Sequence, residues 1–204
     1  MSAISYRPSL WYRVCDLCAI VWHVLTLRDH TEPVAAEGTA VLVLDVIEPY
    51  RELWSDERTA HLTRLLKAAR RAQCPIIFTR WARTRECPLD VIAAKGHWSE
   101  FLPSSDNQLI FGPYEDGDKV LPVEHTNAFA HKCVRDALRG CKTVVVTGMW
   151  TESCVRSTVA AAAERNVFPI VVAPCCAGHG LDHTYALCTM QALHASVVSD
   201  VVFS

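Results

Sequence analysis

The sequence alternates short aliphatic runs with amphipathic segments from residue 39 to its end. Residues 39–47, "TAVLVLDVI", are β-branched or aliphatic almost throughout, which is typical of a strand buried on both faces of a parallel sheet. After Ser55, a candidate N-cap, residues Leu62, Leu65, Leu66 and Ala69 share one helical face. Further strands are expected at residues 74–80, 119–123, 142–148, 168–174 and 196–203, with helices at 127–140, 154–166 and 181–195. This alternation predicts an α/β fold, doubly wound, with a mostly parallel sheet and helices on both faces.

The chain is long enough for one domain with a sizeable core, because half of its 204 residues are hydrophobic. We expect residues 39–204 to form this domain and residues 1–38 to form a helical N-terminal extension. Residues 31–38 are the expected linker between the two. Residues 81–118 form a long irregular segment, and such segments usually carry function or cover a site.

Composition narrows the class of partner and the compartment. The net charge is −2 with both signs spread along the chain, so we expect no nucleic-acid partner and a small-molecule or protein partner instead. The apolar run at residues 17–27 is too short to span a bilayer. Ten cysteines without a convincing signal peptide indicate reduced thiols in a cytoplasmic protein. Arg7 and Arg13, in an N-terminus without acids, leave organelle targeting open.

Two residues stand where the carboxyl ends of the expected strands meet. Asp45 lies at the end of the first core strand, where an acid is expensive to bury without a partner; the alternative is an aspartate that caps a turn. Cys154 begins a helix directly after a strand. Unpaired N–H groups at a helix N-terminus would lower the pKa of this thiol, although a small buried core cysteine is the alternative. A lone C-x-x-C, Cys15 and Cys18, is read as structural or incidental rather than as a metal site.

Several stretches resemble the isochorismatase-like cysteine hydrolase family, which includes nicotinamidases, N-carbamoylsarcosine amidases and ureidoacrylate-type amidohydrolases. The most specific is G-x-x-T-x-x-C-V at residues 148–155, inside "LRGCKTVVVTGMWTESCVRSTVAAAAERNVFPIVVAP". The others, in family order, are "AVLVLDVIEPY", "CPIIFTR", "GDKVLPVEHTNAF" and "HTYALCTMQALHASVVSDVVF". Together they cover about residues 39–203.

The resemblance implies a six-stranded parallel sheet and an Asp–Lys–Cys triad. It matches Asp45 to the base and Cys154 to the nucleophile that attacks a carbonyl carbon and forms a thioester. It also implies a cis peptide between Met149 and Trp150, which directs the backbone N–H groups of Trp150 and Cys154 into an oxyanion hole. Family members often form dimers or tetramers, so we expect a homo-oligomer. We expect neither a cofactor nor a metal, because Asp90 and His97 do not form a convincing ligand cluster.

The chain departs from the family at the triad lysine. Counting back from "NAF" places Val123 at that position. Lys119 lies four residues away, roughly 13 Å along a strand, and His125 shares the face of Val123 only if the strand stays regular. Other cations in reach along the chain are Arg80, Arg83, Lys95 and His97. Two smaller departures are Ile47, where glutamine is usual, and Pro174, where many members carry aspartate.

Three functions remain open at this point. The first is hydrolysis of a small amide or carbamoyl C–N bond through Cys154 and Asp45. The second is a non-catalytic family member that binds or assembles, which the missing lysine favours. The third is cleavage of an ether-type bond, against which the retained cysteine argues. Residues expected to flank a substrate pocket, or to act as packing anchors, are Trp81, Trp98, Phe101, His125, Met149 and Thr151; aromatic stacking there would suit a flat or quaternary ligand.

Overall fold

A six-stranded parallel sheet forms the centre of the computed structural model, which describes residues 30–81, 110–192 and 195–204. The strand order is β4-β3-β2-β5-β6-β7, so the order reverses between β2 and β5, where ligand sites form in doubly wound sheets. The predicted fold class is confirmed. The strands are β2 (Thr39–Leu44), β3 (Ile76–Trp81), β4 (Lys119–Val123), β5 (Thr143–Met149), β6 (Phe168–Ala177) and β7 (Ser196–Val198).

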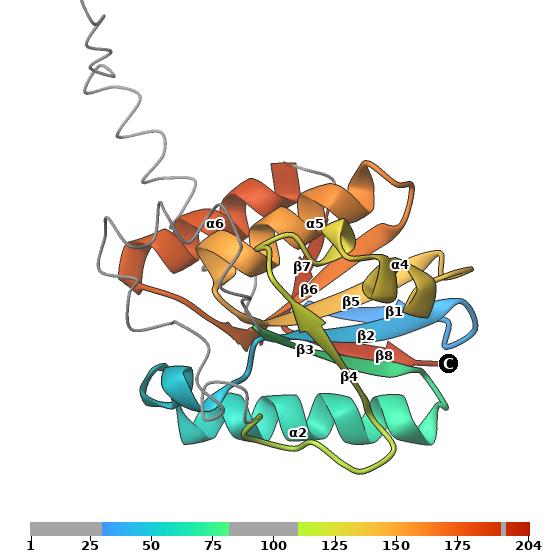
Figure 1. Ribbon diagram of the computed structural model, residues 1–204, viewed down its shortest axis with the longest axis horizontal. Helices are drawn as coiled ribbons and strands as arrows, with labels where there is room; N and C mark the ends of the chain where they lie inside the picture. The colour runs from blue at the N-terminus through green and yellow to red at the C-terminus, as the bar shows by residue number, and fades with distance from the viewer. Residues whose placement is uncertain (1–29, 82–109, 193–194) are drawn as a thin grey trace, which may run out of the picture.

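Helices cover both faces of the sheet. Figure 1 shows α2 (Asp56–Arg71) on one face and α4 (Lys132–Ala137), α5 (Arg156–Ala163) and α6 (Gly180–Ala192) on the other. The Ser55 hydroxyl accepts the N–H of Arg58 and caps α2 as predicted. The predicted apolar face of α2, Leu62, Leu65, Leu66 and Ala69, is buried. Among the described residues, no helix has both the length and the apolar composition that a membrane crossing requires.

Strand β6 extends three residues beyond residue 174, where the sequence predicted it to end, because it contains a large bulge. Val146 of β5 pairs with Val171 of β6, but Gly148 pairs with Cys176, so Thr147 lies opposite residues 172–175. A bulge bends a strand and re-aims its side chains. Here it follows the last residue of β6 that pairs with β7, Val172, and it turns Ala173 and Pro174 toward a cavity described below.

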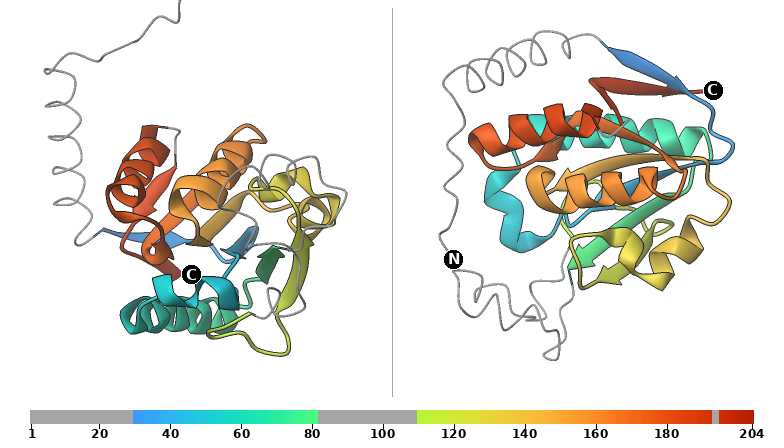
Figure 2. Two further views of the ribbon diagram at one scale, coloured as in Figure 1. Left: turned by 60° about the vertical axis from the view of Figure 1, so that its left-hand side comes forward. Right: turned by 90° about the horizontal axis from the view of Figure 1, so that it is seen from above.

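Two sequence predictions about the ends of the domain are wrong. The expected linker at residues 31–38 contains a strand, β1 (Thr31–Val34), which pairs in parallel with β8 (Asp200–Phe203) in a separate two-stranded sheet (Figure 2). The expected last strand at residues 196–203 is divided at Ser199 between β7 and β8. Ser199 is tied by its N–H and its hydroxyl to the carbonyl of His30, which holds the chain where it changes sheets.

The helix expected at residues 127–140 is also interrupted. It consists of a 3-10 turn, η5 (Ala128–Ala130), followed by α4, with His131 in an extended conformation between them. Nε2 of His131 accepts the backbone N–H groups of Glu124 and His125. The imidazole therefore ties the chain after β4 to the start of α4, and a continuous helix gives way to this contact.

Candidate active site

Asp45 leaves the sheet directly after β2 and turns its carboxylate into the protein. Its φ of +50° lies in the left-handed region, which aspartate tolerates better than most residues. The side chain is only 2% exposed, and Oδ1 accepts the hydroxyl of Thr79 at 2.9 Å. Because Thr79 lies on the neighbouring strand β3, the two central strands together fix the position of this acid.

Gly148 allows the chain that carries Cys154 to pass close to Asp45. Its φ is +106°, and a Cβ placed there would lie 2.1 Å from the carbonyl oxygen of Leu44, the residue before Asp45. The Met149–Trp150 peptide bond that follows is cis, as the family resemblance implies. The chain then enters a π-helical turn, η6 (Thr151–Val155), and continues into α5. This path places Cys154 against the end of β2.

Cys154 is buried and meets three groups. It is 4% exposed, and its thiol lies near enough to the Asp45 carboxylate for each group to shift the pKa of the other. The backbone N–H of Trp150 and the hydroxyl of Ser153 also act on the sulfur and lower the pKa of the thiol. The structure therefore brings together the predicted pair and one predicted oxyanion donor. Ser153 was missed, since a serine beside a cysteine carries no distinctive sequence signal.

The ionisation of this pair differs from the expectation for a helix N-terminus. Burial, followed by the negative charge of Asp45, raises the pKa of Cys154 well above its ordinary value, and the bonds from Trp150 and Ser153 offset this only in part. Burial raises the pKa of Asp45 to about 6, against the hydrogen bonds from Thr79 and Cys154. The expected lowered cysteine pKa is therefore wrong, because desolvation outweighs the N–H groups. At neutral pH the pair holds one proton, and it resides on sulfur.

No cation joins the pair in the described part of the chain. Val123, at the family lysine position, ends β4 and is 1% exposed. It belongs to the same cluster of buried apolar residues as Cys154. Arg80 and Lys119 are not among the groups that shift the pKa of Cys154. Arg83, Lys95 and His97 lie outside the described residues.

The residues predicted to line a pocket are widely distributed. Trp81 is half-buried and packs against the clusters on both faces of the sheet. Met149 is fully buried, and the Thr151 hydroxyl donates to the carbonyl of Ala177. His125 is exposed, with its ring centroid 5.4 Å from that of His131. Trp98 and Phe101 lie outside the described residues, so their part in a pocket stays a prediction, as it does for the others.

The side chain of Trp150 is held by contacts that the sequence did not suggest. The indole stacks on the imidazole of His179 with ring centroids 4.2 Å apart and an interplanar angle of 12°. The indole also makes an edge-to-face contact with Tyr50, with ring centroids 5.1 Å apart. Glu152 accepts hydrogen bonds from both Nδ1 and the backbone N–H of His179, which fixes the imidazole against the indole.

The described residues contain no group of three or more His, Cys, Asp or Glu side chains placed to bind a metal ion.

Comparison with known proteins identifies the family and the fold. The model of the isochorismatase domain matches residues 39–201. No curated protein matches the sequence. A cysteine hydrolase from Pseudomonas syringae pv. phaseolicola 1448A superimposes with a TM-score of 0.71 at 18% identity, over 84% of this chain and 94% of that chain.

Two further solved structures share the fold. The pyrazinamidase of Pyrococcus horikoshii, solved in complex with zinc, gives a TM-score of 0.69 at 17% identity and covers 79% of this chain and 98% of its own. The N-carbamoylsarcosine amidase of Thermoplasma acidophilum gives 0.64 at 22% identity, over 78% and 95%. At these identities the similarity establishes the fold.

Proposed function

The chain belongs to the isochorismatase family, and from this premise we propose that it hydrolyses a small amide or carbamoyl C–N bond through a thioester at Cys154. The observation that carries the proposal is the burial of the Cys154 thiol and the Asp45 carboxylate side by side, so that each shifts the pKa of the other. A nucleophile within hydrogen-bond reach of a base that is itself oriented by a third group is the arrangement that covalent catalysis requires. Here Thr79 provides that orientation.

The proposed reaction proceeds in two steps. As sulfur attacks the carbonyl carbon, its proton passes to Asp45, and the C–N bond then breaks while Asp45 returns the proton to the leaving amine. Water next attacks the thioester and gives a proton to Asp45. The C–S bond breaks, and that proton returns to sulfur. The backbone N–H of Trp150 is near enough to the sulfur to lower the pKa of Cys154, which supports a role for this N–H in stabilising the charge that develops on the oxygen of the attacked carbonyl.

The raised pKa values give a physical account of how the pair could work without the family lysine. A thiolate beside a carboxylate is a repelling pair of anions that a cation would have to stabilise. With Asp45 ionised above a pKa of about 6 and Cys154 still protonated, the resting pair carries a single negative charge. The proton then moves only when sulfur begins to attack.

The experiment that tests this needs no known substrate at first. The rate of alkylation of Cys154 is followed against pH by peptide mass spectrometry on the folded protein, with exposed Cys133 as the internal reference. We expect the Cys154 rate to rise through about pH 6 as Asp45 becomes able to accept the proton, and we expect Asp45→Asn to remove this inflection. A Cys154 rate that rises only in parallel with direct thiol ionisation at high pH would contradict the role of Asp45.

A second stage tests turnover. The protein is exposed to an activated acyl ester, and the acyl group is located by mass spectrometry. We expect it on Cys154 in the wild type, and we expect Cys154→Ser to lose it while Cys133→Ser keeps it. A panel of small primary amides and N-carbamoyl amines is then screened by ammonia release.

We further propose that the substrate is a small molecule and that the protein acts as a cytoplasmic homo-oligomer.

The second candidate function is a non-catalytic family member that binds or assembles. The observation that favours it is the absence of any cation beside Cys154 among residues 30–81, 110–192 and 195–204. This candidate predicts an inert Cys154, with no inflection near pH 6 and no acyl transfer from the activated ester. The same two experiments therefore separate the candidates.

A further inference from the structure

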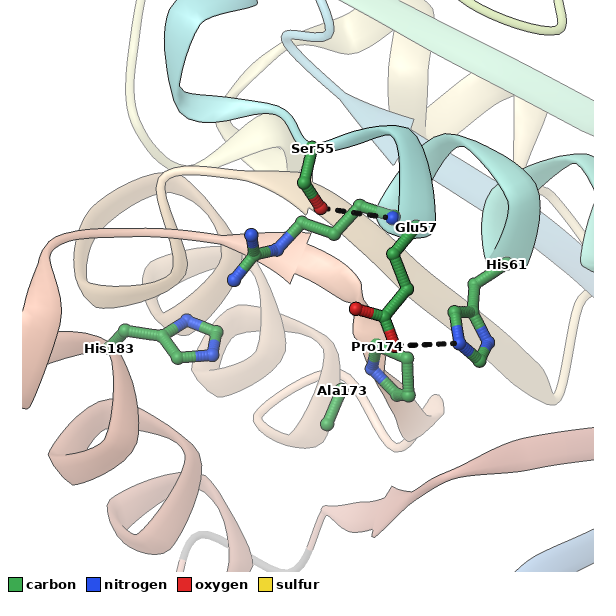
Figure 3. A pocket seen from close by; sticks show the side chains of 7 residues that line it. Ser55, Glu57, His61, Ala173, Pro174 and His183 are labelled. Atoms are coloured by element: carbon green, nitrogen blue, oxygen red, sulfur yellow. Dashed lines mark hydrogen bonds and ion pairs between the residues drawn. The ribbon is translucent and has the colours of Figure 1, made fainter.

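A second concave site lies outside the Asp45–Cys154 pair, between the start of α2, the bulge of β6 and α6. Figure 3 shows its lining, in which His183 faces the side chains of the α2 residues across the opening. The cavity volume is about 270 Å³, just below the usual range for small-molecule pockets. The cavity is lined by Ser55, which caps α2, by Glu57, Arg58 and His61 of α2, by Ala173 and Pro174 of β6 and by His183 of α6.

Arg58 presents an unused hydrogen-bonding fork at this cavity. Its Nε donates to the carbonyl of Cys176 at 3.0 Å, which holds the guanidinium in one position. Within the residues that the structure describes, its two terminal nitrogens have no hydrogen-bond or ion-pair partner. A guanidinium fixed at Nε with both terminal nitrogens open matches the two oxygens of a carboxylate.

The imidazole of His183 offers the cavity a hydrogen-bond acceptor, whereas Arg58 offers donors. The Thr151 hydroxyl donates its one proton to the carbonyl of Ala177 at 2.9 Å, so it accepts from Nδ1 of His183 at 2.8 Å. This network assigns the ring proton to Nδ1 and leaves Nε2 as an acceptor. Burial, together with the positive charge of Arg58, lowers the pKa of His183, which keeps the ring neutral. His183 therefore calls for a hydrogen-bond donor on the ligand.

The remaining lining limits the charge of the ligand. Glu57 lies 3.9 Å from Nε2 of His61, and Arg64 donates to Nδ1 of the same ring. The cavity thus combines the guanidinium of Arg58, the carboxylate of Glu57 and the neutral imidazole of His183, and a dianion would be repelled by Glu57. Ala173 and Pro174, turned inward by the bulge, offer a short apolar surface.

We propose that this cavity binds a small monocarboxylate that carries a hydrogen-bond donor on the adjacent carbon, as 2-hydroxy and 2-amino acids do. The carboxylate pairs with the terminal nitrogens of Arg58, and the donor reaches Nε2 of His183. The proposal does not depend on the activity of Cys154.

The site borders the candidate catalytic turn. Thr151, which orients His183, immediately follows Trp150, whose N–H contacts the sulfur of Cys154. Arg58 holds the carbonyl of Cys176, and Cys176 pairs with Gly148 in the sheet. The cavity is therefore linked to this segment through His183, which bonds Thr151, and through Arg58, which bonds the strand that pairs with Gly148.

The test uses ¹⁵N-histidine-labelled protein and follows the two-bond ¹H–¹⁵N signals of His183, assigned with His183→Gln. Lactate carries both features of the ligand, propionate lacks the donor, and 1,2-propanediol lacks the carboxylate. We expect lactate to shift Nε2 of His183 saturably, propionate to bind more weakly, and 1,2-propanediol to leave the signal unchanged. No shift with lactate, or equal shifts with all three compounds, would overturn the proposal.

Matched variants on α2 locate the charge. Arg58→Gln is expected to weaken lactate binding by about tenfold or more, since hydrogen bonds to charged groups are the strong ones. Arg71→Gln removes the same charge from the exposed C-terminal end of the same helix and is expected to bind as the wild type does. Equal weakening in both variants would show a non-specific charge effect. If Arg58→Gln fails to fold, Ala173→Leu, which fills the cavity and keeps Arg58, is expected to abolish the lactate shift.

Discussion

The Asp45–Cys154 pair and the Arg58–His183 cavity hold opposite charges in different surroundings. The Asp45–Cys154 pair is almost fully buried, and burial raises both pKa values, so that one proton and one negative charge remain. The Arg58–His183 cavity keeps a full positive charge with an open hydrogen-bonding fork. The Asp45–Cys154 pair, called the dry site below, is suited to moving a proton. The Arg58–His183 cavity, called the charged site below, is suited to holding an anion.

The difference also shows where positive charge acts in this fold. The charge of Arg58 adds to burial in lowering the pKa of His183 and opposes only a small part of the rise that burial causes in the pKa of Cys176, but Arg58 is not among the groups that act on Cys154. The chain therefore has a cation that acts on His183 and Cys176 but does not act on Cys154. It does not replace the family lysine, whose position is filled by Val123. The predictions below test how far the two sites are separate.

The largest effect is expected from Gly148→Ala. A Cβ at this position would lie 2.1 Å from the carbonyl oxygen of Leu44 and 2.6 Å from its nitrogen, and both atoms belong to the central strand. With φ at +106°, we expect a loss of roughly 4 kcal/mol or more, or failure to fold, because overpacking and backbone strain combine. Urea unfolding measures it.

Gly178→Ala is the matched control. There the added Cβ would meet Oε2 of Glu152 at 2.1 Å, which is the end of a flexible side chain rather than backbone. We expect a much smaller loss, with the main effect on the contact between Glu152 and His179. Equal losses for both glycines would contradict the view that the close approach of β5 to β2 is what builds the active site.

The second prediction restores a cation to the buried site. Val123→Lys places an amine in the cluster that contains Cys154, and we expect it to be less stable than Val123→Met by roughly 3 kcal/mol because an ammonium is expensive to bury. Its charge should favour ionisation of the pair, so the alkylation rate of Cys154 should rise at a lower pH than in Val123→Met. Identical pH profiles for the two variants would show that residue 123 does not face the pair.

Local signals made much of the architecture predictable. The cap at Ser55, the buried face of α2 and the parallel strand order follow from patterns within a few residues of each other. Asp45 was singled out because an acid after an apolar run needs a partner, and Cys154 because it starts a helix after a strand. The structure brings these two together.

The features that could not be predicted depend on contacts between distant segments. The pKa of Cys154 rises because Asp45 and the surrounding core are close to it in space, whereas the sequence shows only the adjacent helix start. The stacking of His179 on Trp150 and the bulge at residues 172–175 likewise need the fold as a premise. The strand β1 was missed because β8, its ladder partner among the described residues, comes at the other end of the chain.

The third prediction concerns the ionisation of the buried acid. Because the folded pKa of Asp45 is raised from 3.8 to about 6, the unfolded chain releases this proton first as pH rises. The wild type therefore loses stability between about pH 4 and 6, by about 3 kcal/mol, and the loss levels off above pH 6. Asp45→Asn lacks this loss, so its stability relative to the wild type should increase by that amount from pH 3 to pH 8.

Chemical denaturation at the two pH values measures this difference. Asp116→Asn, at an exposed position, serves as the control and should show no comparable change. A difference between Asp45→Asn and the wild type that is the same at both pH values would mean that Asp45 is ionised without penalty. Asp45 would then lie in surroundings that are not dry, and the contrast between the two sites would not hold.

The smallest effect is expected where the two sites meet. Thr151 is completely buried, and its hydroxyl joins Ala177 and His183. Thr151→Val keeps the shape but leaves both partners unsatisfied, at a cost of about 2 kcal/mol. Thr158→Val is a matched control, since Thr158 is equally buried and its hydroxyl accepts the N–H of Ala128 and donates to the carbonyl of Thr126.

Both threonine variants should therefore lose similar stability, but they should differ in ligand binding. Only Thr151→Val frees His183, so only this variant should weaken the lactate-induced shift at Nε2. Thr158 lies on α5 and contacts the chain between β4 and α4, away from the cavity. If both variants bind lactate equally well, the Thr151 hydroxyl does not orient His183, and the two sites are independent. If Thr151→Val alone loses binding and also changes the alkylation rate of Cys154, the turn transmits occupancy of the charged site to the dry one.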